Sequence, residues 1–582
     1  MLRRCGVIFL FLLYCLPILA AEPKTLEKIV IAKPAARDQR YSIDSQYLEN
    51  SSVKSLTEAF GLLGIDTQAR SLNYGIQSDL SFRGLGFEGL TILFNGQRIN
   101  DPQTGHFNAD IPFVTEDIKE IELDPLKGTV NLIPKPTAER KNIFQNTYAE
   151  HETYSGLLSV SHKREDAGLS LSLQRNESEG FREGVDFKTF TASLYSDMRF
   201  SAGQEAYLSL GYNEKEFGAY DFYTPGSGFP SKEWIKSLLL NTGVNLEADG
   251  FLFKPRFLWR RHFDKFMLDR TQARSSYLNH HRTDVYAGGL SLELPEGFFD
   301  YLCLDTQFQE EGIESTRLGK HSRQDYRISM DMKEQLGAQM LLESTLAFDY
   351  FDSFKNQFSG SAVLSYLFSQ HQRLSLGVSQ SVRAPTFTEI YYIDPLTIGN
   401  INLLPEEWLT YELAYNYKNN QLDTGLAIFF RQEDDLINWV KKKPAELWQA
   451  RNILEADCFG IEAHFMQRFN SCLRGRLTYA FIDKHLKERG WLYKYGPSYA
   501  SHIFKSLLEF DLSLFSTSME LEYKKRPRRN GWFLLNLSVW RKLNKHTRVF
   551  FKIGNLLNVE YQDIEGIPSP GSWAEAGIRL EW

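Results

Sequence analysis

The sequence predicts an all-β membrane protein built around one antiparallel transmembrane β-barrel. Apolar and polar residues alternate in short runs, for example over residues 169–175 and 206–213, and this period of two is that of β-strands. Aromatic residues make up 14% of the 582 residues, which suits a barrel with aromatic rings at both membrane interfaces. The chain also carries an export signal but no later run of ~18 apolar residues for a transmembrane helix. An exported chain that stays in a membrane must then span it as a closed barrel.

Residues 1–20 are expected to be the signal peptide. A basic start at Arg3 and Arg4 precedes an apolar core at residues 7–19 and small residues for cleavage at Ala20 and Ala21. The apolar core is too short to cross a bilayer as a helix. The formal net charge of −7 gives no basic surplus, so nucleic acid is not expected as a partner.

Residues 21–39 are expected to form a linker that contains one β-prone run. In residues 26–32 (LEKIVIA), Ile29 and Ile31 share one face of an extended segment. Such a run can pair with a partner protein as an added strand. An ordinary first strand of the following domain is the alternative. The position of the run ahead of residues 33–37 (KPAAR) favours a mobile tether.

Residues 40–138 are expected to form a separate N-terminal domain of short strands and turns. Residues 84–89 (GLGFEG) match the GxGxxG pattern of dinucleotide-binding folds, but a helix must follow that pattern. A β-like run follows here, so we expect the glycines to form a tight turn. Four motifs mark the domain: LSFRG at 80–84, LTILFNGQRIND at 90–101, IKEIE at 118–122 and GTVNLIPK at 128–135.

Residues 139–582 are expected to form the barrel. A soluble β-sandwich would show the same alternation with its apolar face inward. The export signal and the high aromatic content favour the membrane barrel over the sandwich. The last segment places Ile578, Leu580 and Trp582 on one face and ends on an aromatic residue. Six further motifs are expected to mark strand ends and turns: SVRAPTFTEIY at 381–391, GNINLLPEE at 399–407, DDLI at 434–437, FGIE at 459–462, GNLLNVEY at 554–561 and PSPG at 568–571.

Taken in order, the motifs of both regions resemble the TonB-dependent outer-membrane receptors and transporters, most of all the type that carries cobalamin (vitamin B12). The resemblance implies an α+β plug at residues 40–138 inside a barrel of roughly 22 strands, and a monomer among the lipids of a Gram-negative outer membrane. The C-terminal segment resembles the signal read by the barrel-assembly machinery, although the family usually ends in Phe and not in Trp582. The run after the signal peptide resembles the TonB box, which would bind the periplasmic energy-coupling protein TonB through Glu27, Lys28, Ile29, Val30, Ile31 and Ala32.

The resemblance also implies a function, which is energised import of a scarce large nutrient. In the family's layout, residues 100–108 are an apical loop of the plug that faces the external ligand. Neutral donors and acceptors dominate this loop, which suits the amide-edged corrin ring of cobalamin. A ferric siderophore or another metal chelate, the alternative cargo, would often meet Arg, Tyr or His clusters. A second stretch, residues 217–226, is expected to be an extracellular loop and, with segments 259–262 and 279–286, resembles cobalamin-type receptors. The expected ligand-binding residues are Asn100, Asp101, Gln103, Thr104, His106, Tyr220, Asp221 and Tyr223.

These residues also have structural interpretations. Asn100 and Asp101 can simply cap a turn, and His106 is expected to be a hydrogen-bonding loop residue and not a metal ligand. Asp221 alone falls short of the six to eight oxygens that calcium needs. We therefore expect no metal and no cofactor.

Other classes of protein receive less support from the sequence. A passive porin has no use for a TonB box and a plug. No GxSxG or HExxH motif is found, so an enzyme is not expected. A barrel hydrolase would need residues brought together only in three dimensions. The cysteines beyond the signal are odd in number and scattered, which predicts neither a disulfide framework nor a metal site: Cys303, Cys458 and Cys472.

One departure from the family lies in the plug. Between Glu122 and Val130 the family usually has a longer glycine-rich passage, whereas this chain runs through residues 124–128 (DPLKG) directly into Thr129. We expect this shortening to change how the plug fills the barrel or how the ligand loops are supported.

Overall fold

A computed structural model describes residues 42–50, 53–223, 226–272, 277–295, 297, 299–487, 490–494 and 499–582. The predicted signal peptide at residues 1–20 and the TonB-box residues 27–32 lie outside the described residues.

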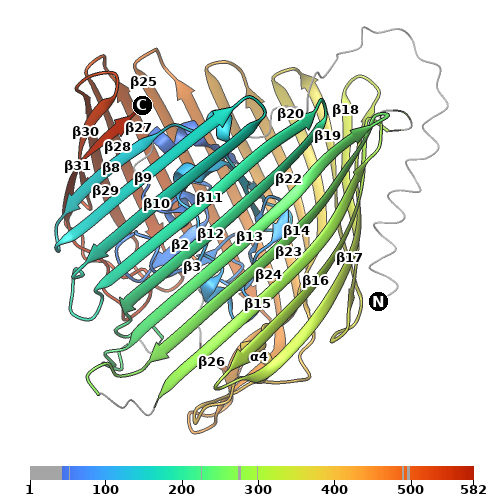
Figure 1. Ribbon diagram of the computed structural model, residues 1–582. Coiled ribbons are helices and arrows are strands. Elements are labelled where there is room, and N and C mark those ends of the chain that lie inside the picture. The colour runs from blue at the N-terminus through green and yellow to red at the C-terminus, as the bar shows by residue number, and fades with distance from the viewer. Residues whose placement is uncertain are drawn as a thin grey trace.

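Twenty-two strands close into one antiparallel barrel, as predicted. The strands run obliquely around the wall (Figure 1), and the last one, β31 (Trp573–Glu581), pairs with the first one, β8 (Ile143–Ala149). Two short strands, β21 (Thr397–Ile398) and β26 (Leu492–Tyr493), lie in connections. The other strands are β9 (Thr153–Arg164), β10 (Ala167–Ser178), β11 (Phe187–Ser201), β12 (Gln204–Gly218), β13 (Lys232–Ala248), β14 (Phe251–Met267), β15 (Leu278–Glu293), β16 (Tyr301–Ser315), β17 (Gly319–Leu336), β18 (Met340–Phe351), β19 (Gln357–Ser369), β20 (Gln372–Arg383), β22 (Glu406–Lys418), β23 (Leu422–Lys441), β24 (Trp448–Arg468), β25 (Leu473–Leu486), β27 (His502–Asp511), β28 (Phe515–Lys525), β29 (Trp532–Lys542) and β30 (Thr547–Gly554).

The barrel has apolar side chains outside and polar side chains inside. In β10, Leu169 and Leu171 are 53% and 38% exposed, whereas Ser170 and Ser172 between them are 1% and 0% exposed. The Ser172 hydroxyl donates a hydrogen bond to Asp117 of the plug at 2.8 Å. A soluble sandwich would place the leucines inside, so this pattern is that of a membrane barrel.

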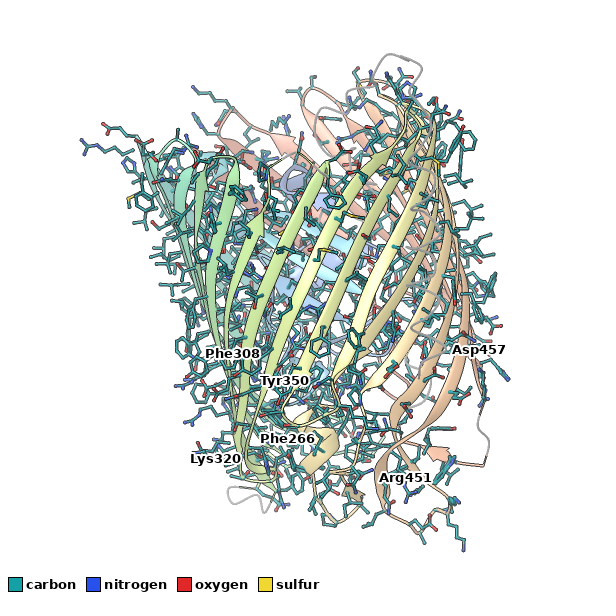
Figure 2. The ribbon with its side chains drawn as sticks, turned by 90° about the vertical axis from the view of Figure 1, so that its right-hand side faces the viewer. Phe266, Phe308, Lys320, Tyr350, Arg451 and Asp457 are labelled. Atoms are coloured by element: carbon teal, nitrogen blue, oxygen red, sulfur yellow. The ribbon has the colours of Figure 1, made fainter. Side chains whose placement is uncertain are left out.

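Aromatic side chains gather in a row on the outer surface. Phe308 and Tyr326 have ring centroids 4.8 Å apart, and Tyr326 and Tyr350 follow at 6.0 Å. Figure 2 shows Phe308 and Tyr350 on neighbouring parts of the outer wall. Such rows are expected where the barrel meets a membrane interface.

The two ends of the barrel differ in their connections. At one end the strands are joined by tight turns, such as residues 202–203 and 249–250. At the other end lie the longer connections 219–231, 384–405 and 555–572. In barrels of this class the longer connections face the cell exterior. In Figure 1 this extracellular end is the lower one, where α4 (Phe387–Tyr391) lies, and the C-terminus is at the upper, periplasmic end.

The plug fills the barrel with a five-stranded mixed sheet in the order β1-β6-β7-β4-β5. Its core is apolar and includes Phe60, Phe94, Ile121 and Leu132. None of the helices in the described part of the chain is long and apolar enough to cross a membrane. The plug elements are β1 (Ser42–Asp44), α2 (Ser45–Asn50), α3 (Leu56–Leu62), β2 (Asp66–Ala69), β3 (Ser78–Ser81), β4 (Thr91–Phe94), β5 (Gln97–Arg98), η3 (Gly105–Phe107), η4 (Thr115–Asp117), β6 (Ile118–Asp124), β7 (Thr129–Pro134) and η5 (Thr137–Glu139).

The GxGxxG segment forms a tight turn, as expected, and leads into strand β4 and not into a helix. Gly84 has a φ of +78°, and a Cβ atom there would lie 3.2 Å from the Cys458 sulfur. Glycine is therefore required at this position both by its backbone conformation and by the close wall.

Two barrel motifs do not mark strand ends, which corrects the expectation from sequence. Residues 434–437 lie within β23 at a bulge, where Asp435 has a φ of 56°. Residues 459–462 lie inside β24. Glu462 points inward there because it binds Arg83 of the plug.

Candidate functional site

The apical loop of the plug, residues 100–108, packs against the barrel wall. The Asn100 side chain accepts a hydrogen bond from the Ile92 amide and donates one to the Leu90 carbonyl, each at 2.8 Å. Asn100 thus fixes the base of the loop to the start of β4.

Asp101 fixes the same loop to β14 and β15. Its carboxylate is 2.6 Å from Nη1 of Arg260 and accepts a hydrogen bond from the Thr283 hydroxyl at 3.1 Å. It also accepts a hydrogen bond from the backbone amide of Gln103 at 2.8 Å. Because Asp101 is buried and fully engaged, it positions the loop.

His106 lies at the meeting point of the two predicted ligand stretches. Its Nδ1 is 2.6 Å from Asp79, and its ring stacks on Phe87 with centroids 4.1 Å apart. Its edge faces the Tyr223 ring at 5.8 Å. Burial raises the pKa of Asp79, but the Arg70 and His106 side chains outweigh this effect and hold that pKa well below its usual range.

Of the three residues predicted in the second stretch, Tyr223 is the one whose side chain joins the apical cluster. Its hydroxyl donates a hydrogen bond to the Glu233 carboxylate at 2.7 Å and accepts one from the side-chain amide of Gln77 at 2.7 Å. Asp221 instead accepts the Gly228 and Phe229 amides within its own connection. The Tyr220 ring lies 5.5 Å from the Arg182 guanidinium, away from the apex.

Several buried polar atoms at the apex have no hydrogen-bond partner within the described part of the chain. They are Gln103 Oε1, Asp264 Oδ1 and His281 Nδ1. Gln103 Nε2 is 3.4 Å from the other oxygen of Asp264, so these groups adjoin. The cluster thus has polar capacity available for a ligand.

The charged residues of this cluster were not predicted from the sequence. Asp79, Glu88, Glu233 and Asp264 stand in runs that read as ordinary strands and turns. The one available signal was that Glu233 and Asp264 occupy inward positions of their strands. That position alone does not distinguish a ligand site from any other polar part of a barrel interior.

The longest connection, residues 384–405, folds back onto the plug through helix α4. The amides of Phe387 and Thr388 donate to the carbonyls of Pro102 and Gln103 at 2.8 and 3.1 Å. Glu88 of the plug accepts the Gly105 amide at 2.6 Å. Burial and then the carboxylate of Glu389 in α4 raise the pKa of Glu88.

Arg83 anchors the plug to the wall deeper in the barrel. Its guanidinium is 2.6 Å from Glu412 on β22 and 2.7 Å from Glu462 on β24, and lies over the Phe429 ring at 4.3 Å. The backbone carbonyl of Arg83 accepts a hydrogen bond from Arg431 at 2.6 Å.

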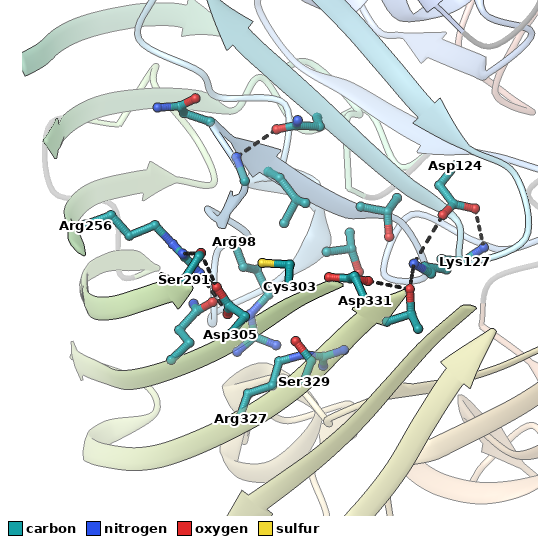
Figure 3. Close-up of a pocket in the computed structure, with 18 of the residues that line it drawn as sticks. Arg98, Asp124, Lys127, Arg256, Ser291, Cys303, Asp305, Arg327, Ser329 and Asp331 are labelled. Atoms are coloured by element: carbon teal, nitrogen blue, oxygen red, sulfur yellow. Dashed lines mark hydrogen bonds and ion pairs between the residues drawn. The ribbon is translucent and has the colours of Figure 1, made fainter. Parts of the chain in front are cut away.

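A cavity of about 1080 Å³ lies between the plug sheet and the wall. Arg98, Asp124 and Lys127 line it on the plug side (Figure 3). Charged and polar side chains line its wall, where Arg256 is 2.7 Å from Asp305. A smaller cavity of about 200 Å³ lies along β25 and β27–β30. No cluster in the described residues is arranged to hold a metal ion.

Comparison with known proteins agrees with this architecture. The family described as TonB dependent receptor-like, beta-barrel, matches residues 131–556. The vitamin B12 transporter BtuB of Photobacterium profundum is 28% identical over 456 residues, covering 72% of this chain and 71% of that protein. The vitamin B12 transporter BtuB of Vibrio cholerae serotype O1 is 21% identical over 584 residues, covering 90% of each.

Solved structures share the fold at low identity. The siderophore receptor PirA from Pseudomonas aeruginosa has a TM-score of 0.73 at 14% identity, over 93% of this chain and 98% of that one. The FrpB iron transporter from Neisseria meningitidis has a TM-score of 0.77 at 13% identity, over 93% and 100%. The plugged barrel and the family match together show that the chain belongs to the TonB-dependent outer-membrane receptors.

Proposed function

We propose that the protein imports cobalamin across the outer membrane with energy delivered by TonB. Two relatives carry the name vitamin B12 transporter. The family is one of receptors and transporters, so we propose no catalytic activity. The observation that supports the cargo best is the charge balance at the plug apex.

Each cation at the apex is held by a carboxylate. Arg70 is 2.7 Å from Asp79, and Arg260 is 2.6 Å from Asp101. In contrast, Glu233 and Asp264 make no ion pair with a lysine or arginine in the described part of the chain. A polyanionic ferric chelate would meet carboxylates here, whereas an amide-edged corrin ring needs only hydrogen bonds and aromatic faces.

We propose direct ligand contacts from Gln103, Thr104, His106 and Tyr223. Gln103 offers an amide oxygen that has no other partner among the described residues, and His106 and Tyr223 offer ring faces and edges. The remaining predicted residues then position the loops: Asn100, Asp101, Tyr220 and Asp221.

Import would be driven through the N-terminal segment. We propose that residues 1–20 direct export, that residues 27–32 pair with TonB as an added strand, and that the C-terminal segment recruits the barrel-assembly machinery. Force on the linker would reach the plug at β1, which in the described part of the chain pairs with β6 alone.

A ferric chelate is the second candidate cargo. Lys442, Lys443 and Arg451 are exposed around the extracellular connection 442–447. Such a basic rim can attract an anionic chelate before it reaches the apex.

Equilibrium binding of cyanocobalamin to the purified full chain in detergent, with a ferric siderophore as competitor, tests the cargo. We expect saturable cobalamin binding, weakened about 5- to 150-fold by Gln103→Ala, because one lost hydrogen bond in a buried site is worth about 1–3 kcal/mol. Gln324→Ala on β17 is the matched control and should bind as the wild type does. A folded barrel that binds the siderophore but not cobalamin contradicts the proposed cargo.

Energy coupling is tested by Ile29→Pro. Proline removes a backbone donor from the added strand, so we expect uptake to fall to background while ligand binding is unchanged. Ile29→Val keeps the donor and should retain uptake. Equal uptake by Ile29→Pro and the wild type would point to passive diffusion.

A further inference from the structure

The large cavity extends almost through the barrel on one side of the plug. Near the periplasmic turns it is lined by Glu205 and Lys254, and near the extracellular strand ends by Ala384 and Trp408. Most of the lining side chains labelled in Figure 3 are polar or charged. A cavity of this size and polarity accommodates water and hydrated solutes.

The short β6–β7 connection explains the free space. Asp124 accepts the Leu126 and Lys127 amides at 3.1 Å each, and the Gly128 amide returns to the Asp124 carbonyl at 2.9 Å. The connection is therefore a compact turn that sends no further chain toward the wall. Lys127 contacts Thr345 on β18 at 3.0 Å and Asp124 of its own turn at 3.5 Å.

A chain of three charged residues separates the cavity from the apical cluster. Arg98 of β5 is 2.9 Å from Glu311 on β16, and Glu311 accepts Arg323 of β17 at 2.6 Å. Arg98 lines the cavity, whereas Glu311 and Arg323 lie behind it and are buried.

Arg323, the outermost of the three charged residues, contacts the connection 384–405, which contains α4. Arg323 donates to the Pro385 carbonyl, and its guanidinium lies 4.9 Å from the Phe387 ring. The first amides of α4 in turn bind the carbonyls of Pro102 and Gln103 in the apical loop. The ligand loop, α4 and the cavity are thus joined through the three charged residues.

Arg98, the innermost of the three charged residues, belongs to β5, a short edge strand of the plug sheet. β5 has two residues and, among the described residues, pairs with β4 alone, through Leu93 opposite Arg98 and Phe94 opposite Gln97. A short edge strand with one neighbour can shift without breaking the rest of the sheet. The Arg98 side chain is 30% exposed, because it borders the cavity.

We infer that this cavity is the inner compartment of the transport path and that Arg98, Glu311 and Arg323 form its outward gate. The inference rests on the proposed import function. Cargo leaves the apex on the β16–β17 side of the plug when Arg98 separates from Glu311, and then enters a polar compartment that accepts hydrated, amide-bearing or charged solutes.

Single-molecule conductance in planar lipid bilayers tests the gate without any cargo. We expect discrete conductance steps in purified full-length Arg98→Ala protein that the wild type lacks. Lys119→Ala, which removes another plug cation paired at 2.9 Å with Glu139, is the matched control and should stay closed. Glu311→Gln provides a second opening variant should Arg98→Ala fold poorly. Folded Arg98→Ala and Glu311→Gln proteins that conduct no more than the wild type overturn the gate.

The route is tested by a cysteine in the cavity of the Arg98→Ala protein. Ser329 lines this cavity and Ser518 lines the smaller one. With Cys303, Cys458 and Cys472 replaced by serine, a small cationic methanethiosulfonate should reduce the current through Ser329→Cys. The same reagent should leave Ser518→Cys unchanged. Block at Ser518→Cys that equals or exceeds block at Ser329→Cys overturns the route. Loss of cobalamin binding in the separate detergent assay would overturn only the cargo.

Discussion

The plug meets the barrel wall in two different ways on its two sides. Toward β22 and β24, Arg83 is 1% exposed and lies 2.6 and 2.7 Å from Glu412 and Glu462. Toward β14–β19, the cavity separates the sheet from much of the wall, and Arg98 is 2.9 Å from Glu311 with a side chain that is 30% exposed.

This difference indicates which side of the plug can move. Removing one partner of a buried ion pair leaves an uncompensated charge in a dry site, so the Arg83 side resists separation. On the other side Arg98 borders the cavity, and the buried Glu311 still has Arg323 at 2.5 Å when Arg98 leaves, so this side separates without leaving a buried charge unpaired. We therefore expect the plug to pivot on its Arg83 side and open on its Arg98 side.

The largest expected effect comes from exchanging the two arginines for alanine, one at a time. Arg83→Ala should lower the opening free energy of the plug by about 3–5 kcal/mol because Glu412 and Glu462 stay buried without a cation. Arg98→Ala should lower it by less, about 1.5–3 kcal/mol, the worth of a hydrogen bond to a charged group, because the buried Glu311 keeps Arg323 as a partner at 2.5 Å. Hydrogen exchange of the Ile92 and Val130 amides measures this energy. Equal losses in the two variants would contradict the pivot.

Two glycines provide a smaller and cleaner version of the same comparison. Gly84 and Gly96 have φ values of +78° and +79°, but a Cβ at Gly84 would lie 3.2 Å from the Cys458 sulfur, whereas nothing lies within 4 Å at Gly96. Alanine should cost about 1–2 kcal/mol of backbone strain at either position. At Gly84 crowding should add about 1–3 kcal/mol.

The crowding can be separated from the strain by a double-mutant cycle. Cys458→Ala should recover part of the loss in Gly84→Ala, because it shortens the side chain that a Cβ at Gly84 would meet. It should recover nothing in Gly96→Ala. The same hydrogen-exchange measurement applies. Equal free-energy costs at the two glycines would mean that β24 accommodates an added Cβ atom as readily as the open space at Gly96 does.

Local periodicity made the barrel predictable. Residues 169–175 and 206–213 lie in β10 and β12, as their alternation indicates. The tight turn at residues 84–89 was predictable too, because a β-like run and not a helix follows it. These features depend on neighbours in the sequence.

Contacts between the plug and the wall could not be predicted in the same way. Arg83 and Glu462 are 379 positions apart, and an inward glutamate in a strand looks like any other polar residue of a barrel interior. For the same reason, residues 459–462 were expected at a strand end. The shortened passage after Glu122 was visible in the sequence. Which part of the barrel wall it leaves uncovered depends on how the plug sheet lies in the barrel, and the sequence does not show this.

The smallest expected effect is a pH dependence of the contact between the plug and α4. Burial and then the Glu389 carboxylate raise the pKa of Glu88, so at pH values between the ordinary glutamate pKa of about 4.3 and that raised pKa the folded state holds a proton that an unfolded glutamate has released. Stability of this contact should fall as pH rises from that ordinary value to the raised one and then level off. Exchange protection of the Phe387 and Thr388 amides, corrected for intrinsic rates, measures the contact. Glu88→Gln should remove the slope, and Glu116→Gln, at a carboxylate 3.0 Å from Arg579, should leave it. A slope that persists in Glu88→Gln would assign the titration to another group and leave α4 unconnected to the protonation of the plug.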